Sequence, residues 1–304
     1  MLHLRNLWDV DDTTIRRIVD RGLTIKAGIL SGNPPPLLAG KVLGLLFEKP
    51  SLRTRTSFEV GMFRLGGQAI ALKHYEVGLG KREPVADVAR VFSSYVDAIV
   101  VRTFDHINVQ QLAEHSSVPV INGLCDTYHP CQILADLLTL KEQWGDWRGR
   151  RLAWVGDGNN VCHSWMIAAA ITGFQLRIAT PESFQPDAAV FARCNELSPG
   201  SVVWSTQCDE IVTGTDAIIT DVWVSMGQEK DAEEKRRLFM PYQVNQKLME
   251  KAADHALLLH CLPAHRGDEV TAALIDGPRS VAWQEAENRL HAQSGLLVEQ
   301  LSTV

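Results

Sequence analysis

Apolar and polar positions alternate along the chain in two kinds of segment. Short runs of apolar residues are separated by longer stretches in which apolar residues recur every three or four positions. The short runs predict buried strands, and the longer stretches predict amphipathic helices. The predicted strands cover residues 42–47, 69–72, 98–101, 118–122, 152–155, 176–179, 202–204, 217–220 and 256–260. The main predicted helices cover residues 10–27, 85–95, 109–115, 132–144, 161–172, 188–197 and 285–301. Because such alternation builds βαβ units, the pattern predicts an α/β protein with parallel sheets.

The alternation is interrupted at residues 145–151, where glycine and polar residues separate two series of strands. We therefore expect two doubly wound domains, each with a central parallel sheet flanked by helices. The first is expected to cover residues 1–145 and the second residues 146–284, with the last helix, 285–304, packing back on the first. A chain of 304 residues is long enough for two domains of ordinary size.

Composition narrows the classes of function. Hydrophobic residues make up 45% and charged residues 22%, which is typical of a globular protein, and no apolar run approaches the length of a membrane span. The net charge of −6 argues against a general role on nucleic acid or on membranes, but it allows an anionic small substrate held by local arginines. Residues 1–12 lack the pattern of a secretory signal, and six cysteines without a CxxC pair favour reduced thiols. We therefore expect a cytoplasmic protein.

A cluster of hydroxyl and arginine side chains follows the first predicted strand. Segment 51–55 lies between that strand and an amphipathic helix. Free N–H groups and the positive end of the helix dipole meet at a helix N-terminus and favour an anion. Ser51 and Thr54 add hydroxyl donors, and Arg53 and Arg55 add guanidinium groups whose geometry suits phosphate. The segment predicts a phosphate site; the alternative is a capped helix start with solvated arginines.

Other polar residues fall where predicted strands end. They are Arg102 and the segments 126–132, 157–160, 221–229 and 260–263. In open parallel sheets, ligands bind beyond the carboxyl ends of the strands. Because five strands end in this way, we expect these residues to share a cleft.

Four of these segments resemble the signatures of ornithine carbamoyltransferases. They are Ser51-Leu52-Arg53-Thr54-Arg55, His129-Pro130-Cys131-Gln132, Asp221-Val222-Trp223-Val224-Ser225-Met226-Gly227 and His260-Cys261-Leu262-Pro263. The resemblance extends over about residues 6–297. It implies transfer of the carbamoyl group of carbamoyl phosphate to the δ-amine of ornithine, giving citrulline and phosphate, without a cofactor or a metal ion. It also implies a role in arginine biosynthesis, with the direction of flux left open.

The resemblance assigns residues to the two substrates. Those implied for carbamoyl phosphate are Ser51, Leu52 through its backbone N–H, Arg53, Thr54, Arg102, His129, Gln132, Cys261, Leu262 through its carbonyl, and Arg289. Those implied for ornithine are Asn160, Asp221, Ser225 and Met226. The catalytic residues implied are Arg53, Arg102, His129, Asp221, Cys261 and Arg289. The chemistry requires donors for the phosphate, donors for the developing oxyanion, and a neutral, oriented amine.

Several of these residues have structural alternatives. His129 could cap the next helix, Cys261 could be a buried apolar residue, Asp221 could be a turn residue, and Arg289 could be solvated. Ornithine enters with a δ-ammonium of pKa ~10.4, so it must lose a proton before attack. Asp221 and Cys261 are the expected partners of that nitrogen, and the ionisation state of Cys261 stays open.

Two positions depart from the family pattern. Leu52 stands where the family commonly has threonine, and we expect little loss because the implied contact uses the backbone. Gly78 stands where a glutamine or histidine usually reaches the phosphate of a neighbouring subunit. We expect Lys81 or Arg82 to replace that contact. The contact would imply shared active sites in a homotrimer or a multiple of it.

Other hypotheses remain open from the sequence. The acceptor could be putrescine or an N-acylated ornithine, whereas aspartate is disfavoured because residues 225–227 offer no cation for a second carboxylate. A nicotinamide-dependent oxidoreductase would fit the glycines of segment 156–161, but Val161 replaces the third glycine of that fingerprint. A carbamoyltransferase-like binding protein without catalysis is favoured by Gly78 alone. No cysteine and histidine spacing matches a tetrahedral metal site, so no metal is expected.

Overall fold

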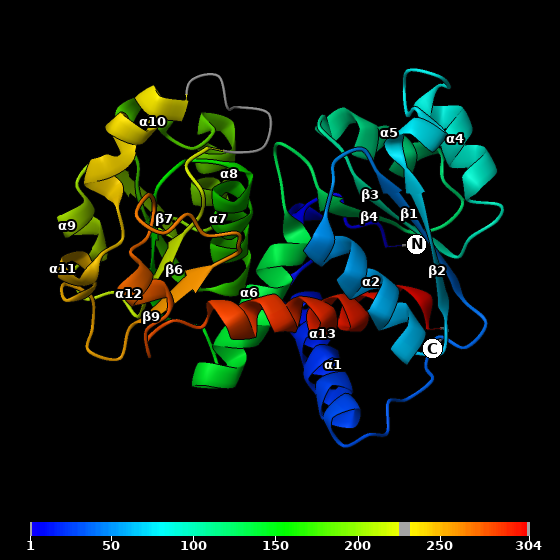
Figure 1. Ribbon diagram of the computed structural model, residues 1–304, viewed down its shortest axis with the longest axis horizontal. Helices are drawn as coiled ribbons and strands as arrows, with labels where there is room; N and C mark the ends of the chain where they lie inside the picture. The colour runs from blue at the N-terminus through cyan, green and yellow to red at the C-terminus, as the bar shows by residue number, and fades with distance from the viewer. Residues whose placement is uncertain (1, 225–231, 303–304) are drawn as a thin grey trace. The chain divides into compact units, whose positions relative to one another are not determined.

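The computed structural model describes residues 2–224 and 232–302. The chain divides into two compact units, one formed by Met1–Leu138 with Glu287–Val304 and the other by Thr139–Ala286. We call them the first unit and the second unit. Each contains a parallel sheet flanked by helices (Figure 1), so the predicted two-domain α/β fold is confirmed.

The described residues of the first unit form a four-stranded sheet in the order β2-β1-β3-β4. The strands are β1 (Val42–Phe47), β2 (Gln68–Lys73), β3 (Ala98–Arg102) and β4 (Val120–Leu124). The helices are α1 (Asp12–Leu30), α2 (Leu52–Arg64), α3 (His74–Val77), α4 (Val85–Phe92), α5 (His106–His115) and the 3-10 turn η1 (Leu7–Asp9). Phe47 pairs with Arg102, and Arg102 pairs with Leu124. This register brings the carboxyl ends of β1, β3 and β4 to one edge of the sheet.

The described residues of the second unit form a five-stranded sheet in the order β7-β6-β5-β8-β9. The strands are β5 (Arg151–Val155), β6 (Gln175–Ala179), β7 (Val202–Ser205), β8 (Ala217–Thr220) and β9 (Leu257–His260). The helices and turns are α7 (Asn160–Thr172), η2 (Glu182–Phe184), α8 (Ala188–Leu197), α9 (Cys208–Val212), α10 (Ala232–Phe239), η4 (Met240–Tyr242), α11 (Gln246–Met249) and α12 (Ala272–Ile275). Thr220 pairs with His260, so the residues that follow β8 and β9 start from neighbouring positions.

Two helices carry the chain from one unit to the other. They are α6 (Pro130–Trp144) and α13 (Ala282–Leu301). In the first unit, α13 packs closely on α1 and α2, beside which Figure 1 draws it in red. A Cβ on Gly295 would lie 2.3 Å from the carbonyl oxygen of Ile18, and one on Gly61 would lie 3.0 Å from Oγ of Ser294. Glycine at these two positions therefore lets α13 pack closely on α1 and α2.

Most predicted elements agree with the structure to within three residues. The strand predicted at 118–122 begins instead at Val120, directly after Pro119, which has no N–H to donate to a ladder. The helix predicted at 85–95 ends at Phe92. No prediction covered α9 to α12.

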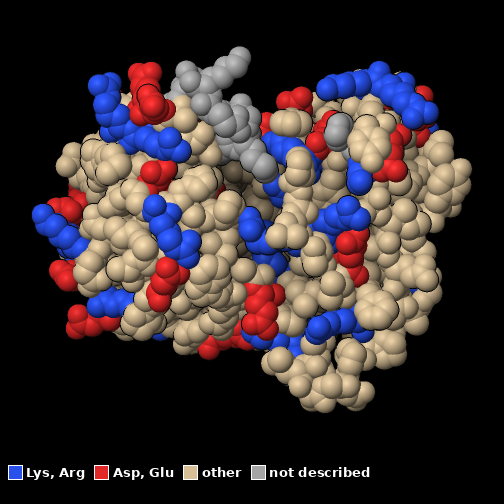
Figure 2. Space-filling view, in the orientation of Figure 1, with Lys and Arg blue, Asp and Glu red and all other residues tan. Residues whose placement is uncertain are grey.

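The surface carries charges of both signs. On the face that Figure 2 shows, basic and acidic side chains of the described residues are interspersed, in keeping with the net charge of −6. Among the described residues, no helix has both the length and the apolarity that crossing a membrane requires.

Candidate active site

The loop between β1 and α2 forms a helix N-terminus of the kind that binds anions. Ser51 is the N-cap, and its Oγ accepts a hydrogen bond from the backbone N–H of Thr54 at 3.2 Å. A serine hydroxyl that accepts in this way still has its own proton to donate. Leu52 is 79% exposed and is the first residue of α2, where backbone N–H groups have no acceptor within the helix, so its N–H can serve an anion. Ser51 thus caps the helix, which was the alternative to a phosphate site, and its hydroxyl proton remains available to a ligand.

A hydrogen-bonded cluster lies behind this loop, at the carboxyl edge of the first sheet. We call it the arginine–histidine cluster; its members, all buried, are Thr54, Arg102, His129, Gln132 and Arg289. Thr54 Oγ1 accepts from Arg102 Nη1 at 3.3 Å and from Arg289 Nη2 at 2.8 Å. Arg289 Nη1 also donates to Nε2 of His129 at 3.2 Å and to Oε1 of Gln132. One guanidinium, carried by α13, therefore joins Thr54 of α2 to His129, which precedes α6, and to Gln132 in the first turn of α6.

The cluster is positively charged. Arg102 and Arg289 donate to the neutral groups of Thr54, His129 and Gln132. Two buried guanidinium groups that converge on Thr54 bring donors and positive charge together, which suits an anionic ligand.

His129 is neutral in this environment. Burial, and then the charges of Arg289, Arg102 and Arg53, hold the pKa of its imidazole well below the ordinary value. Nε2 faces an arginine N–H and must accept, which places the ring proton on Nδ1. His129 is consequently a hydrogen-bonding group here and not a cationic acid.

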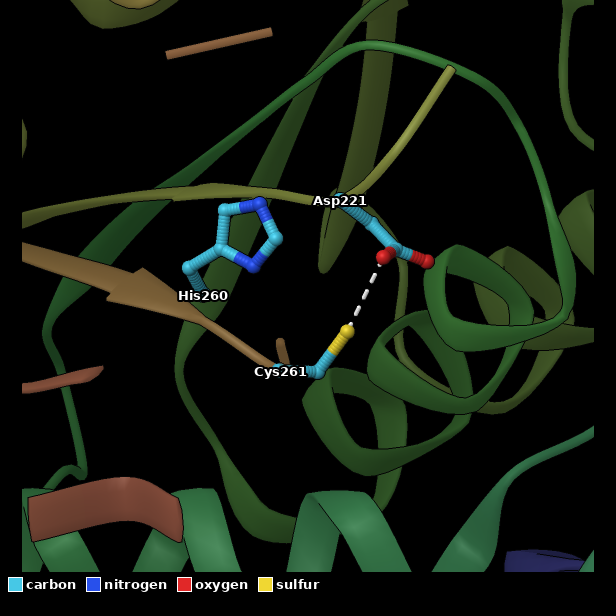
Figure 3. Close-up of side chains that lie close together, drawn as sticks. All are labelled: Asp221, His260 and Cys261. Carbon is cyan, nitrogen blue, oxygen red and sulfur yellow. Dashed lines mark hydrogen bonds between the residues drawn. The ribbon is translucent and has the colours of Figure 1, made fainter. Parts of the chain in front are cut away.

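The second unit holds a thiol and a carboxylate side by side, as Figure 3 shows. Asp221 follows β8 and Cys261 follows β9, and the Cys261 thiol donates to Oδ1 of Asp221 at 3.0 Å. Asp221 is 8% exposed, and its Oδ2 accepts from Nδ2 of Asn159 at 2.8 Å. The carboxylate is thus oriented from two sides while Cys261 stays half-buried.

Asn159 was missed by the sequence prediction, which named its neighbour Asn160. Asn159 is the N-cap of α7, and its Oδ1 accepts from the backbone N–H groups of Val161 and Cys162. An asparagine before an apolar run is a capping signal that the sequence contained. Asn160 is the first residue of α7 and is half-buried. The predicted residues Ser225 and Met226 lie outside the described residues.

The turn after β9 is held by its histidine. Leu262 has φ +56°, and its N–H donates to Nδ1 of His260 at 3.0 Å. The peptide bond between Leu262 and Pro263 is cis. His260 Nε2 lies 3.0 Å from Oε1 of Glu269.

Possible metal ligands meet at this turn. Ligand atoms of Asp221, His260 and Cys261 lie within 4.8 Å of one another. Both ring nitrogens of His260 are already engaged, so the imidazole could ligate a metal only by giving up a hydrogen bond. This donor set does not favour a metal site.

The comparisons with known proteins match two successive parts of the chain to two family models. Residues 2–142 match the carbamoyl-P binding domain of aspartate/ornithine carbamoyltransferases, and residues 148–299 match the Asp/Orn binding domain of the same proteins. The chain belongs to the aspartate/ornithine carbamoyltransferase family. The resemblance inferred from the motifs is confirmed.

Individual relatives of this carbamoyltransferase family cover nearly the whole chain. The ornithine carbamoyltransferase of Nitrosococcus oceani is 50% identical over 295 residues, which are 97% of this chain and 96% of the relative. That of Carboxydothermus hydrogenoformans is 49% identical over 292 residues, 95% and 94% of the two chains. The solved ornithine carbamoyltransferase of Pyrococcus furiosus superposes with a TM-score of 0.95 at 45% identity, covering 99% of this chain and 97% of that one.

Gly78, the departure from the carbamoyltransferase pattern, has a structural cause. Its φ is +59°, and a Cβ at this position would lie 2.7 Å from Cβ of Arg82. The backbone N–H groups of Lys81 and Arg82 both donate to the Gly78 carbonyl at 2.8 Å, which closes the loop tightly. Arg82 Nη1 donates to the carbonyl of Glu76 at 3.2 Å. This loop conformation favours glycine and draws the Arg82 side chain onto its own loop.

The glycines of segment 156–161 are explained by packing in this carbamoyltransferase fold. A Cβ on Gly158 would lie 2.4 Å from the backbone nitrogen of Pro186. Asp157, between the two glycines, pairs with Nζ of Lys235 at 2.7 Å. The oxidoreductase hypothesis therefore loses the feature that suggested it.

Proposed function

We propose that the protein transfers the carbamoyl group of carbamoyl phosphate to the δ-amine of L-ornithine, giving L-citrulline and phosphate. The observation that carries the proposal is the arginine–histidine cluster, in which buried cations converge beside the N-terminus of α2. The names of the relatives support the same acceptor.

The phosphate is proposed to bind at the start of α2. The Ser51 hydroxyl, the N–H of Leu52, and the side chains of Arg53, Thr54 and Arg102 are the donors in this proposal. The helix dipole adds positive potential at the same place. Arg102 and Thr54 already touch at 3.3 Å, so their donors are arranged before the ligand arrives.

We propose that the bound carbamoyl group replaces some of the hydrogen bonds that Arg289 makes in this structure. Arg289 now donates to Thr54, His129 and Gln132. In this proposal a bound carbonyl oxygen takes up the Arg289 donors, together with the Thr54 hydroxyl, and His129 donates to it through Nε2 once Nε2 no longer accepts from Arg289 and carries the ring proton. Because these donors are fixed and buried, they stabilise the negative charge that grows on that oxygen as the amine attacks. Gln132 and the carbonyl of Leu262 are proposed to bind the carbamoyl amino group.

Ornithine is proposed to bind through the second unit. Asp221 accepts from the δ-nitrogen, and Cys261, already donating to Asp221, is the second partner of that nitrogen. Asn160, Ser225 and the backbone of Met226 bind the α-substituents in this proposal. Residues 1–145 with the last helix, 285–304, would then be the carbamoyl phosphate-binding domain, and 146–284 the ornithine-binding domain.

The proposal extends to assembly and context. Lys81 is the better candidate for the contact with a neighbouring phosphate, because the Arg82 side chain is held by Glu76. Such a contact requires a homotrimer, or a multiple of it, which sedimentation of the wild-type protein tests. We also propose that the enzyme acts in arginine biosynthesis in the cytoplasm.

The test is citrulline formation from carbamoyl phosphate, with ornithine, putrescine, N-acetylornithine and aspartate compared as acceptors. Selective turnover of ornithine is expected, and Cys261→Ser should reduce it while Cys208→Ser, a half-buried cysteine outside the site, should not. Turnover of another amine instead would contradict the acceptor. A folded protein without turnover on any of them would contradict the function.

A further inference from the structure

A fully buried histidine–glutamate pair lies directly behind the turn that follows β9. His260 and Glu269 are both 0% exposed, and Nε2 of His260 lies 3.0 Å from Oε1 of Glu269. Neither residue has a part in the chemistry proposed above. A glutamate is almost never fully buried unless it is paired, and this pair adjoins Cys261 and Leu262.

The hydrogen bonds fix the state of the imidazole. The N–H of Leu262 points at Nδ1 of His260, so Nδ1 carries a lone pair and Nε2 carries the proton. Nε2–H then donates to Glu269, whose Oε1 also accepts from the backbone N–H of His265. The ring is a rigid spacer, in one tautomer, between a buried carboxyl group and a backbone N–H.

The backbone that this spacer holds is strained. Leu262 has φ +56°, in the left-handed region that a leucine side chain disfavours. On the other side, the N–H of His260 donates to Oε2 of Glu285 at 2.9 Å. The backbone of residues 260–262 therefore donates two hydrogen bonds to buried side chains, one from His260 to Glu285 and one from Leu262 to His260. The thiol of Cys261, between them, donates to Asp221.

We propose that His260 and Glu269 are positioning residues which, through the Leu262 N–H, aim the Leu262 carbonyl at the carbamoyl amino group. The inference rests on the proposed function for the identity of the ligand. It assigns no direct substrate contact to either residue. Loss of the Nδ1 acceptor should let Leu262 relax from its left-handed conformation and turn the carbonyl away.

Two substitutions at His260 distinguish the role of Nδ1 from the role of Nε2. In His260→Asn, the side-chain oxygen can occupy the place of Nδ1 and accept from Leu262, whereas the contact with Glu269 is lost. In His260→Gln, the side-chain amide can reach Glu269, whereas the acceptor for Leu262 is lost. His255→Gln, at a histidine that is largely exposed, is the matched control.

The experiment measures the Kd of carbamoyl phosphate and of inorganic phosphate by calorimetry, together with kcat and KM for citrulline formation. For His260→Gln we expect roughly tenfold weaker carbamoyl phosphate binding, and unchanged binding of inorganic phosphate, which lacks the carbamoyl group. His260→Asn should stay within about threefold of wild type. Thermal unfolding identifies any variant that fails to fold, and Glu269→Gln, which keeps an acceptor, provides a second, milder perturbation.

The possible results are distinct. Equal Kd values for the two His260 variants, or an equal loss of affinity for both phosphates, would overturn the inference. If wild-type protein forms no citrulline but the variants still differ in carbamoyl phosphate binding, the proposed reaction fails and the positioning role stands.

Discussion

Replacing Lys235 with methionine should destabilise the second unit in a manner that depends on pH. Lys235 lies on α10, and its Nζ is 2.7 Å from Oδ2 of Asp157. The two side chains are only 9% and 13% exposed, and the ammonium also lies 5.0 Å from the ring centre of Phe184. Methionine fills a similar volume but leaves the aspartate without its cation.

The magnitude follows from this burial. Removing one partner of a buried ion pair costs about 3–5 kcal/mol, because the remaining charge is uncompensated. In a unit of this size, about 2–4 °C of Tm corresponds to each kcal/mol, so we expect Tm to fall by roughly 10 °C near neutral pH.

The pH dependence has a definite sign. Burial raises the pKa of Asp157 above its ordinary value, while Lys235 opposes the rise and Asp221 adds to it. An acid with a higher pKa in the folded state favours folding below its unfolded pKa of about 3.9, and this contribution is lost as pH rises through the folded pKa. Without Lys235 the loss is larger. Lys235→Met should therefore be close to wild type near pH 4 and much less stable at pH 7.

Thermal unfolding between pH 4 and pH 8 tests the argument. The double variant Asp157→Asn/Lys235→Met should recover most of the stability, because neither charge of the buried pair remains. Lys251→Met, which breaks a pair between the half-buried Lys251 and the exposed Asp209, should change stability by less than about 1 kcal/mol. A Lys235→Met variant with unchanged stability at pH 7, or a double variant less stable than both single variants, would refute the reasoning.

Three other predictions concern the first unit. Arg289→Lys keeps the charge, but a lysine ammonium cannot bridge Thr54, His129 and Gln132. We expect kcat in steady-state assays to fall by about 10²-fold or more, and a normal kcat would contradict the bridging role. Folding lowers the pKa of His129, so its stabilising contribution is present above about pH 6.5 and is lost as pH falls. In His129→Asn, the free energy of unfolding measured with urea should therefore fall less on acidification than in wild type, and an unchanged fall would count against a neutral ring. Gly78→Gln should lose about 1–2 kcal/mol of stability from its positive φ without tighter carbamoyl phosphate binding, and a lower KM would show that the loop accepts a side chain there.

The strands were the most predictable part of the fold. Buried parallel strands read as continuous apolar runs, and the bounds of β1 and β8 agree with the prediction residue for residue. The helices α9 and α11 have five and four residues, too few for a periodic pattern to emerge. Helix α10 is mostly charged, and its formation depends on tertiary contacts such as that of Lys235.

For the candidate site, the sequence indicated residue types and strand ends but not the contacts between them. The convergence of Arg289 on His129 spans 160 positions and depends on how α13 packs in the first unit. Asn159 and Glu269 were missed because a second hydrogen bond, seen only in three dimensions, distinguishes each from an ordinary cap or surface acid.

The order in which the ribosome delivers this chain has a consequence for the arginine–histidine cluster. Arg289 is made 157 residues after Gln132. At about 5–20 residues per second, a nascent chain spends roughly 8–30 s with the rest of the cluster synthesised and its bridging guanidinium absent. The anion site is therefore completed only after residue 289 has been made, so a chain terminated before that residue would keep the first sheet without the side chain that bridges its donors.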